Sequence, residues 1–329
     1  MAGPDRRGRV MDLWLDLPAR SAQPQACALG NFDGVHLGHQ AVIAEMIAAG
    51  PELAAGALVL DPHPRQVLHP DQPLSLLTTM QERAGLLTAY GVERCYRLPF
   101  TDHVRTMSAE AFVVEILKER LDARMVAVGR NYRFGYRAQG DVSVLRRLGR
   151  LRGIEVVVAK QLRLGGQPIS ASMIRRQLAA GQLAMASRRL GRYYQSGGTV
   201  VAGDRRGTAI GFPTANLRLP DFKVLPQDGI YAAWAKAEGE DWLPAAVHLG
   251  PRPMFGPTPV LEVHLIGGAG DLYGRHMEVA WVRRLRAAAR YADVSALVRQ
   301  IGKDVRSALE VLGRLPPPAS WQVEGQPPL

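Results

Sequence analysis

Two histidines, His36 and His39, lie three residues apart, a few residues after a short apolar run that ends at Gly30. If a helix begins here, its first turn presents both imidazoles on one face, together with backbone N–H groups that have no partner within the helix. Such a helix end attracts phosphate, and glycines such as Gly34 and Gly38 let the backbone approach a ligand closely. The pattern favours transfer of a phosphoryl group with stabilisation of the charge that develops on it.

The spacing of the two histidines also has simpler interpretations. His36 and His39 could form half of a zinc site, although no cluster of cysteine and histidine residues completes it in the sequence. Either histidine could instead be a hydrogen-bonded residue of the core. An isolated short motif is weak evidence, so phosphate chemistry and these alternatives stay open at this point.

The longer segment around the histidines is more specific. Residues 30–39 read Gly-Asn-Phe-Asp-Gly-Val-His-Leu-Gly-His, and this resembles the HxGH signature of the HIGH-type nucleotidyltransferases. In full, the segment resembles the adenylyltransferase half of the bacterial bifunctional riboflavin kinase/FAD synthetase (FMN adenylyltransferase) family. The resemblance implies that His36 and His39 are catalytic. It also implies that ATP or its phosphates are bound by Gly30, Asn31, Phe32 and Asp33.

Three further segments match this family in the same order along the chain. They are Asp-Pro-His-Pro-Arg at 61–65, Val-Gly-Arg-Asn-Tyr-Arg-Phe-Gly at 128–135 and Ile-Ser-Ala-Ser-Met-Ile-Arg at 169–175. By resemblance, the residues that place ATP are Asn131, Ser170, Ser172 and Arg175. Ser170 or Ser172 could equally well cap a helix. Ala171 stands where the family usually has a serine, so a hydroxyl ligand is missing at that position.

The second half of the chain carries a different set of matches. Gly-Phe-Pro-Thr-Ala-Asn at 211–216 resembles the riboflavin kinase motif that binds the metal and the ATP phosphates. The resemblance assigns Gly211, Thr214 and Asn216 to this site, and a hydroxyl and an amide oxygen are hard ligands suited to Mg²⁺. The other interpretation is a proline turn ending in asparagine. Glu262, in Leu-Glu-Val-His, is by resemblance the base that takes the proton of the ribityl hydroxyl.

Several positions of the second half depart from the family pattern. They are Arg205, Thr208, Met254 and Ala288. We therefore consider a bifunctional enzyme that phosphorylates riboflavin and adenylylates FMN, and, as the alternative, an FMN adenylyltransferase whose barrel has weak or lost kinase activity or acts on a modified flavin. A binding protein for flavin or nucleic acid and a sister nucleotidyltransferase are further candidates, and the phosphate motifs in both halves argue against them.

Apolar strand patterns alternate with amphipathic helix patterns in the first half. We expect strands at 25–29, 56–60, 95–98, 125–128 and 154–158, and helices at 39–49, 79–90, 109–121 and 142–150. This order predicts an α/β domain with a doubly wound parallel sheet. Ligands of such sheets bind beyond the carboxyl ends of the strands, which is where residues 30–39 would lie.

Two short helices are expected next, at 172–178 and 184–190, and the pattern then changes. Short runs at 199–201, 231–235, 245–249, 261–265 and 277–282 are separated by glycine and proline and predict a small antiparallel barrel. A C-terminal helix is expected at 294–312. The predicted domains are 1–185 for FMN adenylyltransferase and 186–313 for riboflavin kinase, with a disordered tail at 314–329.

The composition of the chain indicates which ligands the protein binds and in which cellular compartment it works. The chain has 329 residues, enough for two domains with separate cores, and contains no apolar run long enough to span a membrane. Two cysteines in apolar surroundings indicate buried thiols, so we expect a cytoplasmic protein. The net charge of +11 suits polyphosphate substrates. We expect Mg²⁺, ATP, riboflavin, FMN and FAD as ligands, and neither a membrane nor a nucleic-acid partner.

Overall fold

The computed structural model describes residues 14–203, 206–252, 256–268 and 270–318 and divides them into two compact units. The first unit comprises the chain as far as Leu74 together with Thr79–Pro168, and the second comprises Ser75–Thr78 and the chain from Ile169 onward. The limit between the two catalytic modules expected at 185/186 stays a prediction, because compactness says nothing of activity. The expected tail at 314–329 lies mostly outside the described residues.

A six-stranded parallel sheet forms the centre of the first unit, in the order β1-β4-β3-β2-β5-β6. The strands are β1 (Trp14–Asp16), β2 (Gln25–Leu29), β3 (Ala54–Asp61), β4 (Arg94–Pro99), β5 (Ala123–Gly129) and β6 (Glu155–Ala159). The five strands expected here are confirmed, while the edge strand β1 was not expected. Apolar runs such as that of β2 form central strands because both faces of a parallel sheet are covered.

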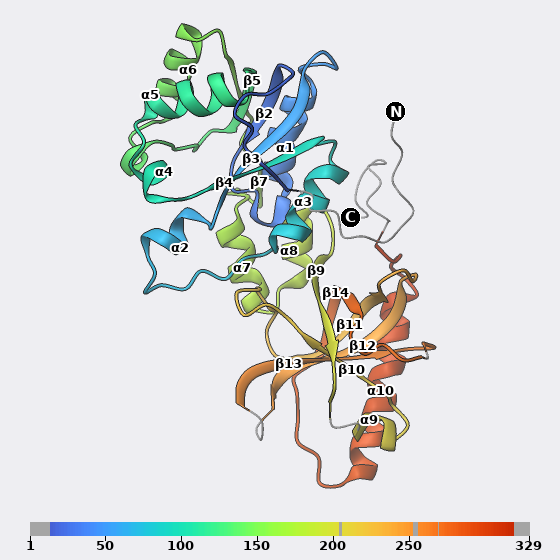
Figure 1. Ribbon diagram of the computed structural model, residues 1–329. Coiled ribbons are helices and arrows are strands. Elements are labelled where there is room, and N and C mark those ends of the chain that lie inside the picture. The colour runs from blue at the N-terminus through green and yellow to red at the C-terminus, as the bar shows by residue number, and fades with distance from the viewer. Residues whose placement is uncertain (1–13, 204–205, 253–255, 269, 319–329) are drawn as a thin grey trace. The chain divides into compact units, whose positions relative to one another are not determined.

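Helices cover the two faces of this sheet (Figure 1). The helical segments are α1 (Leu37–Ile47), α2 (Pro64–Leu68), α3 (Met80–Ala89), α4 (Asp102–Thr106), α5 (Ala109–Ala111), η2 (Phe112–Arg120) and α6 (Val142–Leu151). Alternate residues of β2 point to opposite faces: Cys27 packs with η2 and α6, whereas Ala28 packs with α1 and α3. The sheet is therefore doubly wound, as expected.

The strand order has one consequence for ligand binding. The chain passes from β2 outward through β3 to β4, and then returns to place β5 on the other side of β2. The loops that follow β2 and β5 diverge at this point, and such a switch point is where open parallel sheets bind ligands. The loop that begins at Gly30 and the loop that contains Asn131 leave the sheet here.

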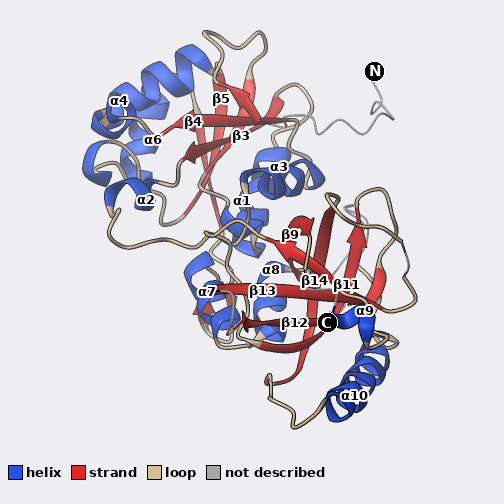
Figure 2. Ribbon diagram, turned by 60° about the horizontal axis from the view of Figure 1, so that its bottom comes forward, coloured by secondary structure: helices blue, strands red, loops and turns tan. Residues whose placement is uncertain are grey.

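A closed antiparallel barrel forms most of the second unit, in the order β10-β13-β12-β11-β14-β9 (Figure 2). Its strands are β9 (Tyr194–Val201), β10 (Ala215–Arg218), β11 (Gly229–Ala237), β12 (Leu243–Arg252), β13 (Gly256–Leu265) and β14 (His276–Arg286). The expected barrel is confirmed, and five of its strands coincide with the apolar runs of the sequence. The strand β10 was missed because it has four residues and follows directly on the Gly-Phe-Pro-Thr turn.

Helices α7 (Ala171–Ala179) and α8 (Leu183–Leu190) share the core of the barrel. Ile174, Leu178 and Leu190 are buried with the barrel residues Tyr231 and Trp281. This common core is why the compact units divide before α7. The segment 75–78 also belongs to this unit, because Leu76 pairs with Lys223 in a parallel bridge.

The last helix, α10 (Val294–Leu312), has the bounds expected from the sequence and packs against β11, β12 and β14. Asp293 caps its first turn by accepting a hydrogen bond from the backbone N–H of Ala296. Two remaining short elements are the hairpin strands β7 (Arg163–Leu164) and β8 (Gln167–Pro168), and a short helix, α9 (Arg206–Ala209), precedes β10. No helix in the described part of the chain is long and apolar enough to cross a membrane.

Candidate active sites

A tight loop joins β2 to α1 and fixes the first candidate site. Phe32 adopts a left-handed backbone conformation with φ of 49°, and the helical turn η1 (Asp33–Val35) follows it. Phe32 is 1% exposed, so its ring anchors the loop in the core below the sheet end. A side chain at Gly30 would lie 3.3 Å from that ring, so glycine fits the close packing here.

His36 and His39 lie together at the beginning of α1. His36 is the N-cap residue: its Nδ1 accepts the backbone N–H of His39 at 3.3 Å, so the proton of a neutral His36 ring is on Nε2. The two rings are stacked, with centroids 3.7 Å apart and planes 15° apart. Phe32 packs edge-on against His39. The expected pairing of the two imidazoles at a helix N-terminus is therefore present in the structure.

The electrostatic setting of His39 keeps its ring neutral. Burial lowers the pKa of His39 well below its usual value, and the nearby charges of His36 and Arg83 lower it further. Its Nδ1 is buried and has no hydrogen-bond partner within the described residues. A buried polar atom of this kind is costly unless a ligand or water completes it, which favours a binding site. No three metal-ligating side chains gather in the described part of the chain to support a zinc site.

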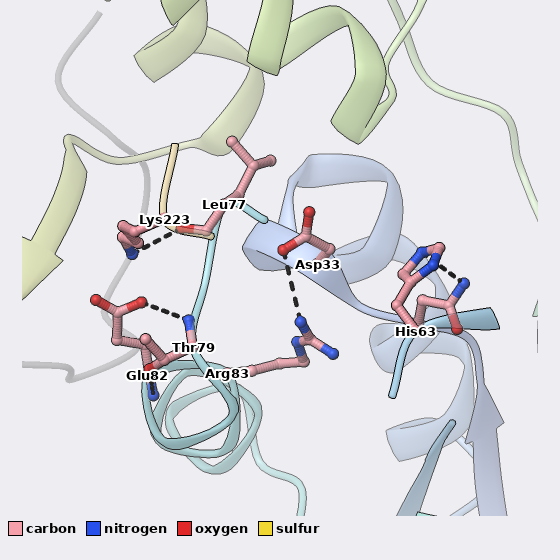
Figure 3. Close-up of polar contacts among 8 residues, drawn as sticks. Asp33, His63, Leu77, Thr79, Glu82, Arg83 and Lys223 are labelled. Atoms are coloured by element: carbon pink, nitrogen blue, oxygen red, sulfur yellow. Dashed lines mark hydrogen bonds and ion pairs between the residues drawn. The ribbon is translucent and has the colours of Figure 1, made fainter. Parts of the chain in front are cut away.

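A buried ion pair holds the loop from the side of α3. The guanidinium Nη2 of Arg83 lies 3.6 Å from Oδ1 of Asp33, and both side chains are 2% exposed (Figure 3). Nearby, the amide Nδ2 of Asn31 lies 3.1 Å from Nε2 of His63, which follows β3. Asp33 was expected to contact ATP, a role that stays a prediction; in the structure its carboxylate faces Arg83.

We expect the Asp33–Arg83 pair to be essential for the stability of the first unit. Arg83→Met removes the guanidinium that faces the buried Asp33 carboxylate, which should lower the free energy of unfolding by about 3–5 kcal/mol. The double variant Asp33→Asn/Arg83→Met should recover part of this loss, because no net charge stays buried. Urea unfolding of the wild type, Arg83→Met and the double variant measures both effects, and a double variant no more stable than Arg83→Met would contradict the pairing.

The other expected ATP-binding residues lie in two different units. Asn131 is exposed and follows β5 at the switch point of the first unit. Ser170 caps α7 by accepting the N–H of Met173 at 3.3 Å, which is the capping role considered from the sequence. Ser172 and Arg175 lie in the first turns of α7, and α7 belongs to the second unit.

The second candidate site lies on the outer face of the barrel. The antiparallel register places Asn216 of β10 opposite Glu262 of β13, and Glu262 opposite His248 of β12. The chain neighbours of Glu262, Leu261 and Val263, are fully buried inside the barrel, so Glu262 and the residues paired with it face outward. Oε2 of Glu262 lies 3.3 Å from Nδ1 of His248, and the two side chains are 30% and 36% exposed.

The turn before β10 presents the remaining residues of this site. Gly211 has φ of +84°, a conformation that favours glycine, and Thr214 is exposed two residues before Asn216. His264 fixes the turn to β13: its Nδ1 lies 2.8 Å from the carbonyl oxygen of Pro213, and its ring meets Phe212 edge-on. The structure thus places Asn216 and Glu262 on the adjoining strands β10 and β13, with Thr214 in the turn that leads into β10.

Three residues of these sites were not singled out from the sequence. Arg83 is hidden in the amphipathic pattern of α3, and no local signal marks it. His63 was part of a matched segment without a role, and its position after a central strand could have indicated one. His248 lies in an alternating strand pattern, and its partner follows only from the strand register.

Of the departures from the family pattern, Arg205 and Met254 lie outside the described residues.

Comparison with known proteins identifies the two units. A family model described as FAD synthetase matches residues 19–173, and one described as riboflavin kinase matches residues 190–312. The Escherichia coli K12 bifunctional riboflavin kinase/FMN adenylyltransferase is 34% identical over 301 residues, covering 90% of this chain and 96% of that protein. The protein of the same name from Listeria monocytogenes is 33% identical, covering 92% and 96%. The chain belongs to the bifunctional riboflavin kinase/FMN adenylyltransferase family.

Membership of this family confirms the predicted function and enzyme class. The protein is a transferase that combines riboflavin kinase with FMN adenylyltransferase and makes FMN and FAD. The fold is shared with a crystal structure described as a macrolide-efflux protein from Streptococcus pneumoniae, with a TM-score of 0.82, 27% identity and coverage of 90% of this chain and 98% of that one. That likeness supports the two-unit architecture.

Proposed function

We propose that the transfer of the adenylyl group to FMN is carried by His36 and His39 at the N-terminus of α1. The observation that carries this proposal is the stacked histidine pair, which lies at the switch point of a parallel sheet. FMN phosphate attacks the α-phosphorus of ATP, and pyrophosphate leaves. The imidazoles and the helix N-terminus stabilise the charge on the phosphoryl oxygens during this step.

The other predicted residues of this half position ATP. Gly30, Asn31 and Phe32 shape the loop beside the histidines, and Asn131 offers an amide from the neighbouring strand end. Ser170, Ser172 and Arg175 are proposed to contact the phosphates, and the guanidinium of Arg175 neutralises charge there. The buried Asp33 carboxylate holds the loop in place through its ion pair with Arg83. We propose that Asp33 helps to place the nucleotide in this way, through the shape of the loop.

We propose that Glu262 is the base of the kinase half and that Thr214 and Asn216 hold Mg²⁺. The donor set fits the ion, because a hydroxyl and an amide oxygen are hard ligands. Thr214 lies in the turn that enters β10, two residues before Asn216, and Asn216 is paired with Glu262, which supplies a carboxylate beside it. When bound, Mg²⁺ neutralises charge on the transferred phosphoryl group. Glu262 accepts the proton of the ribityl hydroxyl as its oxygen bonds to the γ-phosphorus of ATP and ADP leaves.

We further propose a cytoplasmic location and small-molecule partners alone. Cys27 and Cys95 are both free and buried, which suits a reducing compartment. Burial raises the pKa of the Cys27 thiol to about 12, so this thiol stays protonated and unreactive. Nucleic-acid binding is not part of the proposal.

An incubation with ATP and either riboflavin or FMN tests whether the protein carries out both reactions and whether each reaction requires Mg²⁺. With Mg²⁺ present, we expect FMN and FAD from riboflavin, and FAD from FMN. Removal of Mg²⁺ with a chelator should stop both reactions, and renewed Mg²⁺ should restore them. FAD from FMN with riboflavin left untouched would instead support a barrel that acts on a modified flavin. Turnover that continues in the presence of the chelator would refute the proposed requirement for Mg²⁺.

We expect Gly203→Ala to impair the kinase selectively. A Cβ at Gly203 would overlap the carboxamide of Asn216, so the substitution displaces a proposed metal ligand. FMN formation should fall by at least about 10-fold, the equivalent of losing one hydrogen bond to a charged group, while FMN is still converted to FAD. Gly302→Ala in α10 is the matched control, because the nearest atom there is the end of the Arg306 side chain at 3.7 Å. Normal kinase turnover in Gly203→Ala would argue against Asn216 as a ligand of Mg²⁺.

A further inference from the structure

His248 is the neighbour of Glu262 on the strand that the barrel register places beside β13. The row runs Asn216, Glu262, His248 across β10, β13 and β12. Glu262 therefore has the proposed metal ligand on one side and an imidazole on the other. Side chains directly opposite each other in an antiparallel pair are close enough for a hydrogen bond, and Nδ1 of His248 lies 3.3 Å from Oε2 of Glu262.

The ring of His248 is confined on its second side as well. A Cβ built on Gly250 would lie 3.1 Å from Nε2 of His248, so the ring leans over the backbone two residues further along β12. With Glu262 on one side and this backbone on the other, the imidazole is restricted in orientation. Both side chains remain about one third exposed, so a substrate can reach the carboxylate.

We propose that His248 is a positioning residue for the phosphorylation of riboflavin. Its Nδ1–H donates to Oε2 of Glu262 and holds the carboxylate so that Oε1 faces the ribityl hydroxyl. The hydroxyl O–H bond breaks, the proton passes to Oε1, the oxygen bonds to the γ-phosphorus, and ADP leaves. The protonated carboxyl then returns its proton to solvent. This inference rests on the proposed role of Glu262 as the base.

The other ionisable groups on these strands have different partners. On β13, the ring of His264 bonds to the carbonyl of Pro213. On β14, Arg286 is paired with Asp304 of α10, which packs against the barrel. Neither contact holds the Glu262 carboxylate in place of His248. An interaction that fixes a base orients the reacting proton acceptor, so its loss should lower kcat more than it raises KM.

Two substitutions separate the hydrogen bond from packing. His248→Leu keeps an apolar side chain of similar size and removes the donor, whereas His248→Asn retains an amide N–H near the position of Nδ1. In steady-state kinase assays, we expect kcat of His248→Leu to fall about 10- to 100-fold with KM little changed, the effect of losing a hydrogen bond to a charged group. His248→Asn should recover most of the rate. His276→Leu, an exposed histidine on β14, is the control.

The pH dependence of kcat distinguishes a lost hydrogen bond from lost packing, because a change in packing alone would not shift it. The donor favours the ionised carboxylate, so in His248→Leu the acid limb of the kcat profile should move to higher pH, and in His248→Asn it should return. Conversion of FMN to FAD and thermal unfolding test whether the variants are folded; if His248→Leu is not, His248→Ala takes its place. Wild-type kcat in the donor-free variant, or equal loss in His248→Asn, overturns the proposal. Full kinase activity in Glu262→Gln would overturn the base itself.

Discussion

Replacing His36 and His39 by alanine is expected to abolish the conversion of FMN to FAD while riboflavin is still phosphorylated. In the proposed mechanism each ring stabilises charge on the transferred phosphoryl group, and removing one such group is expected to lower kcat by about 10²–10³-fold. The rings are stacked on one another at the N-terminus of α1, so the two losses should not add, because one substitution already disturbs the other ring. Product chromatography with riboflavin and with FMN as separate substrates measures both activities.

The N-cap role of His36 calls for its own control. His36→Ala also removes the acceptor for the backbone N–H of His39, which should cost about 1 kcal/mol of stability. His36→Asn keeps a capping acceptor and removes only the ring. We expect His36→Asn to be as inactive as His36→Ala in FAD formation but more stable. Loss of FMN formation in these variants would contradict the assignment of the two reactions to separate sites.

Replacing Glu262 by glutamine is expected to remove kinase turnover and to leave the adenylylation of FMN unchanged. Glutamine has nearly the shape of glutamate but cannot accept the proton, and loss of a general base lowers the rate by about 10²–10⁴-fold. The side chain lies on the outer face of the barrel and is partly exposed, so the stability of the second unit should change little. Initial rates of FMN formation at saturating riboflavin measure the effect.

A second glutamate of the barrel provides the matched control for this substitution. Glu278 of β14 also faces outward and forms an ion pair with Lys236, 3.7 Å apart and partly exposed. Glu278→Gln should leave both activities near wild type, because exposed pairs contribute little. Equal kinase rates in the two glutamine variants would mean that Glu262 does not act as the base.

Much of the architecture follows from local patterns in the sequence. The strands β2 to β6 contain short apolar runs, and the helices between them show one apolar face, so their order predicts the doubly wound sheet. The helix α10 matches its expected bounds because Asp293 caps its first turn. The strand β9 extends further than its apolar residues suggest, because pairing with β14 stabilises its Gln-Ser-Gly-Gly segment.

The grouping of α7 and α8 with the barrel could not be predicted from local patterns. Ile174 and Leu190 are apolar residues of short amphipathic helices that could cover either unit. They are buried with Tyr231 and Trp281, and this places the two helices in the second unit. The burial depends on the shape of a core that is assembled from strands distant in sequence. The pairing of Leu76 with Lys223 likewise joins parts of the chain far apart in sequence.

The sequence by itself determined which chemical groups are present and on which local elements they lie: His36 and His39 at a helix start, Asn216 after a turn and Glu262 in a strand. The tertiary structure decided their partners. Arg83 meets Asp33 because α3 packs beside the loop after β2, and His248 meets Glu262 because the barrel register sets their strands side by side. Such contacts are selected by packing and strand register between distant segments, and a buried charge like Arg83 is tolerated only where that assembly supplies its counter-charge.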